Sequence, residues 1–338
     1  MSHTPTIAIV ILNWNRLDLT MLCLESVRNQ SHMALKTIVV DNGSTDNSVT
    51  WLKKQTDVTL IVNPKNLGFA RAINQGFKMA LSLGYEYVVS LNNDARISHT
   101  WLNTLAQHML DNPSTGFCQG ASMQEFDNSL YDSTGIYLER GFIPNQRAAG
   151  LTEPRLEIPA IGPNAAGAIY RASMLVATQI SEGEYFDNRF FAYVEDVDFN
   201  LRCTLRGYKF DFVPEAKLFH IGSATGNKIA KKKMYWGARN LVWLVYKNAP
   251  LAILRQTIKL IVKSHLANLQ YLHREQRVHF LPYLRGLVAG LILLPLFIKK
   301  RSANLKNQTI SNDEFLALLV PSNPPLSNPL RKLLNLLE

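Results

Sequence analysis

The sequence predicts an α/β protein with a mostly parallel sheet flanked by helices, and two observations support this. Short runs of β-branched and apolar residues, typical of strands buried on both faces, alternate with longer segments of helical periodicity. The first four predicted strands all end in polar side chains. With 338 residues and 47% hydrophobic content, the chain can form one large domain or two smaller ones.

The elements of the first part follow from this alternation in chain order. Each apolar run is too short for a typical helix and stops at Asn, Asp, Gly or Ser, which favour turns. Between the runs, apolar residues return at helical spacing. The predicted strands are 6–12, 37–40, 58–62 and 87–91, and the predicted helices are 17–28, a segment beginning at 49–54, and 70–83.

The polar strand ends predict a nucleotide pocket, because ligands of open α/β sheets bind at the carboxyl edge of the strands. Asp94, flanked by Asn92 and Asn93, is suited to hold a divalent metal on a phosphate. The alternative for these three residues is a simple polar turn. The chain contains neither G-x-G-x-x-G nor G-K-[ST], so the pocket is of neither the dinucleotide nor the P-loop type.

After a predicted helix at 101–111, two later stretches carry information. In 162–173, small residues allow a backbone to approach a ligand closely, or they form a tight packing turn. In 190–222, Glu195, Asp196 and Asp198 begin a helix, and a strand at 210–213 leads to His220. The acids and the histidine are either helix caps and a core residue, or a functional cluster whose charge is relieved by a metal, an arginine or raised pKa values.

Six motifs in this order resemble those of an inverting family 2 glycosyltransferase with the GT-A fold, especially its bacterial rhamnosyltransferase-like branch. The resemblance covers roughly residues 5–225 and is specific because the motifs occur together. They are VILNWNR (10–16), VVDNGSTD (39–46), NLGFARAINQGF (66–77), LNND (91–94), YVEDVDFNLR (193–202) and His220.

The resemblance implies a Rossmann-like catalytic domain that transfers a sugar, rhamnose in that branch, from a dTDP- or UDP-sugar. The acceptor would be a hydroxyl of a lipid-linked glycan or surface polysaccharide in cell-envelope synthesis. Asp196 would be the catalytic base with Glu195 beside it, and Asp94 and His220 would bind Mn²⁺ or Mg²⁺. Asn92 stands where the D-x-D motif has its first acid. The implied nucleotide-side residues are Asn13, Asp41, Ser44, Asp46, Asn66, Gly68, Arg71, Asn74, Asn92 and Asn93, and those assigned to the acceptor side are Gly167, Ala168, Tyr193, Asp198 and Arg202.

Two other classes of function remain open from the residues. A sugar-phosphate nucleotidyltransferase would need a glycine-rich basic loop to bind a triphosphate, and residues 13–16 at this place contain no glycine. A non-catalytic membrane-bound scaffold would not need Asp94, Asp196 and His220 together. Release of nucleoside diphosphate from a nucleotide-sugar indicates transfer, release of pyrophosphate indicates the nucleotidyltransferase, and no turnover indicates the scaffold.

The charge pattern divides the chain into a catalytic domain at 1–226 and a basic, mainly helical region at 227–338. Residues 227–301 hold 15 Lys and Arg against one acid, Glu275. Such a segment suits an anionic membrane surface, and no nucleic-acid motif accompanies it. The alternative is a helical region that packs on the catalytic domain or on a second subunit in a homodimer.

The same region predicts the location of the protein. The apolar run 286–298 is shorter than the roughly 20 residues that span a bilayer, so an interfacial or re-entrant segment is expected. The start MSHTPTIAIV does not resemble a signal peptide. The three widely spaced cysteines predict a reducing compartment. We therefore expect a cytoplasmic protein, peripheral at the inner face of the cell membrane.

Overall fold

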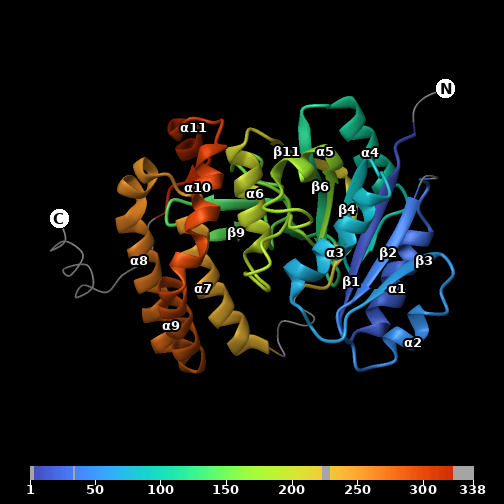
Figure 1. Cartoon of the computed structure of the whole chain (residues 1–338), viewed down its shortest axis with the longest axis horizontal. Helices are drawn as coiled ribbons and strands as arrows, with labels where there is room; N and C mark the ends of the chain where they lie inside the picture. Colours follow the sequence, from blue (N-terminus) through green and yellow to red (C-terminus); the bar gives the residue numbers. More distant parts are fainter. Residues whose placement is uncertain (1–3, 33–34, 223–228, 323–338) are drawn as a thin grey trace.

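The computed structural model of the protein describes residues 4–32, 35–222 and 229–322. A mixed nine-stranded sheet runs through it in the order β3-β2-β1-β4-β10-β6-β11-β5, and β7 pairs with β6. Helices cover the sheet, and α7–α11 gather beside it at the side away from β3 (Figure 1). The predicted α/β class and the helical C-terminal extension are confirmed.

The first part of the sheet is parallel, as predicted, because β1 pairs in parallel with β2 and β4 and β2 pairs in parallel with β3. In this register Asn13 lies beside Asp41 and Leu12 beside Asn92, so the polar strand ends meet at one edge. The elements are β1 (Ile7–Asn13), α1 (Leu17–Arg28), β2 (Leu35–Asp41), α2 (Ser48–Leu52), β3 (Val58–Val62), α3 (Phe69–Ser82) and β4 (Tyr87–Asn92).

The second part makes the sheet mixed, since β10 runs antiparallel to β4 and β6, and β5 antiparallel to β11. The strand predicted at 210–213 continues past a register shift along β6 and ends at His220 itself. The elements are β5 (Ala95–Ile97), α4 (Trp101–Asp111), β6 (Thr115–Gln124), β7 (Tyr131–Ser133), β8 (Ile136–Glu139), β9 (Pro144–Gln146), β10 (Gly167–Arg171), α5 (Ala172–Thr178), α6 (Glu195–Leu205) and β11 (Lys209–His220).

The C-terminal helices share a core with the catalytic part. Leu138 and Leu201 belong to one buried apolar cluster with Leu244, Ile253 and Phe315, and β12 pairs with β8 in a second, three-stranded sheet with β9. The predicted division at 226–227 falls outside the described residues. The elements are α7 (Ala230–Asn248), α8 (Leu251–Glu275), α9 (Arg277–Ile292), the 3₁₀ helix η2 (Leu294–Phe297), α10 (Ile298–Lys306), α11 (Asn312–Ala317) and β12 (Leu319–Val320).

Two glycines let α9 pack closely on α7. A Cβ atom at Gly286 would lie 2.4 Å from the carbonyl oxygen of Tyr235, and one at Gly290 would lie 3.0 Å from that of Arg239. The G-x-x-x-G spacing in α9 therefore serves helix packing inside this protein. Among the described helices none is long and apolar enough to cross a membrane alone, whereas α9 and the segment Leu294–Lys306, bent by 59°, pass that test as a pair.

The basic region is less exposed than the sequence predicts. Lys247 has no exposed surface and Trp243 is 3% exposed, because both face the interior from α7, and Lys300 forms ion pairs with Glu184 and Asp187. These side chains thus serve the protein interior rather than a membrane surface. Lys228, at the predicted start of the basic cluster, lies outside the described residues.

Candidate active site

A cleft of about 1010 Å³ opens at the carboxyl edge of β1, β2 and β4. The strand ends, β9, residues 191–197 and the beginning of α7 all contribute to its lining. Its volume is at the upper end of the range typical of ligand sites, roughly 300–1,000 Å³. The predicted site residues that line it are Asn66, Gly68, Asn92, Asn93, Asp94, Tyr193, Glu195, Asp196 and His220.

A buried polar network fixes the strand ends beneath the cleft. Asp41 accepts hydrogen bonds from Nδ2 of Asn13 at 2.7 Å and from the backbone N–H of Ser44 at 2.9 Å. Nδ2 of Asn93 donates to Oδ1 of Asn13 at 3.2 Å. Because all four of these polar groups are satisfied by one another, they hold β1, β2 and the end of β4 in fixed relation. Asp46 accepts from backbone N–H groups at the start of α1 and α2 and does not line the cleft.

Asp94 and His220 meet at one corner of the cleft. Nε2 of His220 lies 3.2 Å from Oδ1 of Asp94, and Nδ1 lies 2.9 Å from Oδ2 of Asp132. Burial opposes the charged imidazole, but the hydrogen bond with Asp132 and the contact with Asp94 outweigh it and raise the pKa of His220 to about 10. No sequence pattern points to Asp132, which lies in the three-residue strand β7.

This corner has the chemistry of a divalent metal site. Nε2 of His220 is buried without a hydrogen bond of good geometry and points to a carboxylate, while Asp132 fixes the other ring nitrogen, as carboxylates do behind many metal-bound histidines. No set of three or more His, Cys, Asp or Glu side chains in the described residues is arranged as a metal cluster. A metal held by Asp94 and His220 would therefore take its other ligands from a diphosphate and water, as Mg²⁺ commonly does.

The acid pair Glu195 and Asp196 lies in the first turn of α6 and faces the same cleft. Burial, together with the charge of Asp196, raises the pKa of Glu195 well above its usual value. Burial also raises the pKa of Asp196, but backbone N–H groups, first that of Val197, oppose the rise, and this N–H donates to Oδ1 of Asp196 at 2.8 Å. Asp196 is therefore the member of the pair that more readily keeps its charge.

Three residues predicted at the nucleotide or acceptor side make their contacts inside the fold. Oδ1 of Asn74 accepts from the backbone N–H of Phe186 at 2.9 Å, and Nδ2 of Asn74 donates to the carbonyl of that residue at 2.7 Å. Gly167 and Ala168 are buried in β10, where a Cβ at Gly167 would clash with Leu218. None of these three residues lines the cleft, and neither does Arg71, which is exposed on α3; their roles toward donor or acceptor stay predictions.

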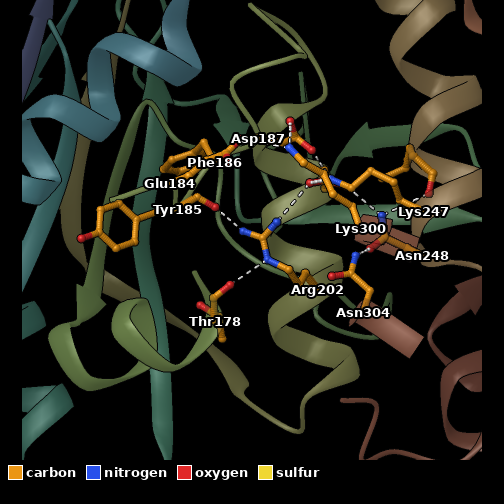
Figure 2. Close-up of polar contacts among 12 residues, drawn as sticks. Thr178, Glu184, Tyr185, Phe186, Asp187, Arg202, Lys247, Asn248, Lys300 and Asn304 are labelled. Carbon is orange, nitrogen blue, oxygen red and sulfur yellow. Dashed lines mark hydrogen bonds and ion pairs between the residues drawn. The ribbon is translucent and has the colours of Figure 1, made fainter. Parts of the chain in front are cut away.

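Asp198 and Arg202 also lie outside the cleft, in a buried cluster of charges. Figure 2 shows Arg202 in this cluster with Asp187 and Lys247. Nζ of Lys247 lies 2.7 Å from a carboxylate oxygen of Asp198 and 2.7 Å from one of Asp187. Arg202 donates to the carbonyl of Thr178 at 3.0 Å. The like charges at the start of α6 are therefore relieved partly by lysine and arginine. Asp198 and Arg202 make structural contacts here, and their acceptor role stays a prediction.

Comparison with known proteins agrees with this geometry. A family model described as "Glycosyl transferase family 2" matches residues 8–167. No curated protein sequence matches the chain. Among solved structures, residues 1–349 of TarS from S. aureus superpose with a TM-score of 0.55 at 15% identity, over 89% of this chain and 88% of that one.

Two further structures have ligands named with them. The mannosyltransferase PcManGT from Pyrobaculum calidifontis, in complex with GDP-Man and Mn²⁺, gives a TM-score of 0.52 at 16% identity over 90% of this chain and 85% of that one. GalNAc-T7 with UDP, GalNAc and Mn²⁺ gives a TM-score of 0.56 at 12% identity, over 73% of this chain and 48% of that one. At these identities the likeness is one of fold. Together with the family match over residues 8–167, it identifies a glycosyltransferase family 2 domain with the GT-A fold in this chain.

Proposed function

We propose that the protein transfers a sugar, with inversion, from a nucleotide-diphosphate donor to a hydroxyl of a glycan, assisted by Mn²⁺ or Mg²⁺. One observation carries the proposal: the Asp94–His220 corner and the Glu195–Asp196 pair face a single cleft. An inverting transfer needs charge stabilisation at the leaving diphosphate and a base at the attacking hydroxyl, and these two groups supply them at separate places.

In this mechanism Asp196 accepts the proton of the acceptor hydroxyl as its oxygen bonds to the anomeric carbon. The bond from that carbon to the diphosphate breaks in the same step, and the nucleoside diphosphate leaves. A divalent metal held by Asp94 and His220 would offset the charge that builds on the diphosphate. Asp132 keeps the imidazole of His220 oriented toward Asp94, and no covalent enzyme intermediate is needed.

The motif resemblance and the ligands named with the related folds support the kinds of donor and acceptor that we propose. The rhamnosyltransferase-like motifs favour dTDP-rhamnose, with UDP-sugars as the alternative, and a lipid-linked or surface-polysaccharide acceptor. Support for a nucleotide-sugar and a metal comes from PcManGT, in complex with GDP-Man and Mn²⁺, and from GalNAc-T7, with UDP, GalNAc and Mn²⁺.

The test is release of nucleoside diphosphate from dTDP-rhamnose, UDP-sugars and GDP-mannose, with and without Mn²⁺. Turnover of one donor that stops with EDTA and returns with Mn²⁺ supports the proposal. Pyrophosphate as the product, or turnover unaffected by EDTA, contradicts it. A thermal-shift screen with dTDP, UDP and GDP identifies the nucleobase independently of turnover.

We also propose that the protein is peripheral at the cytoplasmic face of the membrane, near a lipid-linked acceptor. Support comes from the excess of basic residues in 227–301 and from three apolar side chains on the outer face of α9. Val288, Leu291 and Ile292 are 48%, 60% and 69% exposed, a pattern that suits the interface of an anionic bilayer.

Because 227–338 shares a core with the catalytic part, deletion of this region would test stability rather than binding. Instead, co-sedimentation with anionic and neutral vesicles should be measured for the wild type and for Leu291→Ser/Ile292→Ser. Salt-sensitive binding of the wild type to anionic vesicles alone, lost in the double variant, is expected. A wild type that stays in the supernatant at low salt refutes the attachment, and sedimentation velocity then tests whether the apolar face joins two subunits.

A further inference from the structure

The loop that leads into α6 has a costly backbone conformation. Phe191, Tyr193 and Val194 have φ angles of 68°, 69° and 70°, in the left-handed region that residues with a side chain rarely adopt. Tyr193 and Val194 directly precede Glu195 and Asp196. A strained backbone next to a functional side chain persists only where its surroundings hold it in place, so the groups that hold this loop also fix the position of Asp196.

One side chain of α7 holds most of the loop. Nδ2 of Asn240 lies within hydrogen-bond distance of three carbonyl oxygens, those of Phe190 at 3.0 Å, Ala192 at 3.0 Å and Tyr193 at 2.7 Å. Asn240 has no exposed surface. Its neighbour Arg239 donates from Nη2 to the carbonyl of Phe190 at 2.9 Å.

The remaining carbonyl in this run is bonded from the nucleotide side. The backbone N–H of Ala70, at the start of α3, donates to the carbonyl of Phe191 at 3.2 Å. A Cβ at Gly68 would lie 2.5 Å from the same oxygen, so this approach requires glycine there. The ring of Phe191 also packs against Trp236 of α7, with centroids 4.7 Å apart. The loop is thus held between α3 and α7, and all four carbonyls from 190 to 193 are satisfied from outside it.

A second side chain of α7 also binds residues around this loop. Two turns after Asn240, Lys247 bridges Asp187 before the loop and Asp198 within α6. Side chains of α7 therefore contact the chain both before and after the proposed base Asp196. The matched family model ends at residue 167, so none of these contacts belongs to the part of the chain it describes.

We infer that Asn240, with Arg239, is a positioning residue for Asp196, which makes α7 part of the catalytic unit. Neither side chain lines the cleft, and Asn240 acts by fixing the loop 190–194 in its left-handed conformation. The inference rests on the proposed function for its consequence in turnover, but the hold on the loop is measurable without any substrate.

The experiment compares Asn240→Ala with Asn304→Ala in the full chain. Asn304 is also a buried asparagine of the C-terminal helices, 5% exposed. It donates to Asn248 at 2.9 Å, and its amide bonds to no residue of the loop. Hydrogen–deuterium exchange of residues 187–196, turnover of the accepted donor with water as acceptor, and the Kd of the nucleoside diphosphate are measured for each.

For Asn240→Ala we expect faster exchange in 187–196, and kcat lower by about 10²-fold, the cost of a misplacement of about 1 Å. The Kd of the nucleoside diphosphate should change by less than about twofold, because the strand-end network is untouched. Asn304→Ala should leave both exchange in this segment and kcat near wild type. If Asn240→Ala does not fold, Asn240→Ser, which keeps one donor, takes its place.

Hydrogen exchange in 187–196 that is the same in Asn240→Ala as in the wild type overturns the inference. It is also overturned if Asn304→Ala, at the same loss of Tm as Asn240→Ala, loses as much kcat. Equal weakening of nucleoside diphosphate binding and kcat overturns it as well, since that pattern indicates general damage. If the wild type turns over no nucleotide-sugar, the proposed function fails, and the exchange comparison alone decides whether Asn240 holds the loop.

Discussion

Replacement of Lys247 by methionine should destabilise the protein strongly. Its ammonium group lies 2.7 Å from carboxylates of both Asp187 and Asp198, and all three side chains have no exposed surface. Methionine has a side chain of similar length but lacks the ammonium group, which lies 5.0 Å from the centre of the Phe190 ring, so one negative charge in the cluster loses its partner. Breaking a buried ion pair from one side costs about 3–5 kcal/mol, out of a total stability of roughly 5–15 kcal/mol.

The expected change in Tm follows from the size of the protein. With an unfolding entropy of about 2.1 cal/mol/K per residue, a loss of 3–5 kcal/mol lowers Tm by about 4–7 °C for a chain of this length. Differential scanning calorimetry at pH 7 measures it. The control is Lys306→Met, because Lys306 is exposed on α10 and should change stability by less than about 0.5 kcal/mol.

The pH dependence provides a second readout. Burial alone would raise the pKa of Asp187, but the charges of Lys247 and Lys300 outweigh it and hold this pKa well below its usual value. A lowered folded-state pKa gives stability that is present above the unfolded value, about 3.9, and is lost as pH falls below it. The wild type should lose stability steeply over that acidic range, and Lys247→Met less steeply.

A Tm for Lys247→Met within 1 °C of the wild type would refute the reasoning. Adding Asp187→Asn to Lys247→Met gives a further check, because it removes the stranded charge while Lys300 keeps its contact with Glu184 at 3.0 Å. The double variant should recover part of the lost Tm. A double variant less stable than Lys247→Met would mean that the cluster does not act through its net charge.

Three further predictions concern the cleft and the helix contact. Asp196→Asn should lower turnover by roughly 10²–10⁴-fold with nearly unchanged nucleotide binding. Near-normal turnover of this variant would mean that Glu195, and not Asp196, is the catalytic base. Asp132→Asn should weaken Mn²⁺ binding by about 10–100-fold, measured by electron paramagnetic resonance without substrate, and an unchanged affinity would remove Asp132 from the metal corner. Gly290→Val should lower Tm because its side chain would meet Arg239 and Val242 of α7, whereas Gly237→Ala, at an open position on α7, should not.

The sequence predicts the first part of the fold well because local signals and tertiary packing agree there. The β-branched runs that become β1, β2 and β4 are mostly buried on both faces, whereas β3 at the sheet edge is partly exposed. The apolar periodicity of 17–28 gives the bounds of α1. The cleft edge follows from them, since parallel strands end together. Asp94, His220, Glu195 and Asp196 do line one cleft.

The remaining site residues depend on contacts between distant segments, which no local pattern reveals. Asp132 contacts His220 across 88 positions, from a strand too short to show alternation. Asp198 looks equivalent to Asp196 in sequence, and only the approach of Lys247 from α7 shows that one acid is structural and the other faces the cleft. In the sequence, nothing distinguishes Asn240 from other polar residues of a helix, and only its three carbonyl partners in the structure reveal its role.

The pairing of β12 with β8 has a consequence for synthesis on the ribosome. Leu319 lies beside Leu138, so β8, whose Ile136 lines the cleft, obtains this neighbour only after about 180 more residues have been made. At roughly 5–20 residues per second, that interval is about 10–40 s. Throughout it the nascent chain carries its nucleotide-side strands together with an open strand edge, a feature that promotes association with other chains. A chain terminated shortly before residue 319 would keep that strand edge exposed permanently. Such a truncated protein should aggregate in the cell, although its proposed catalytic residues are all present.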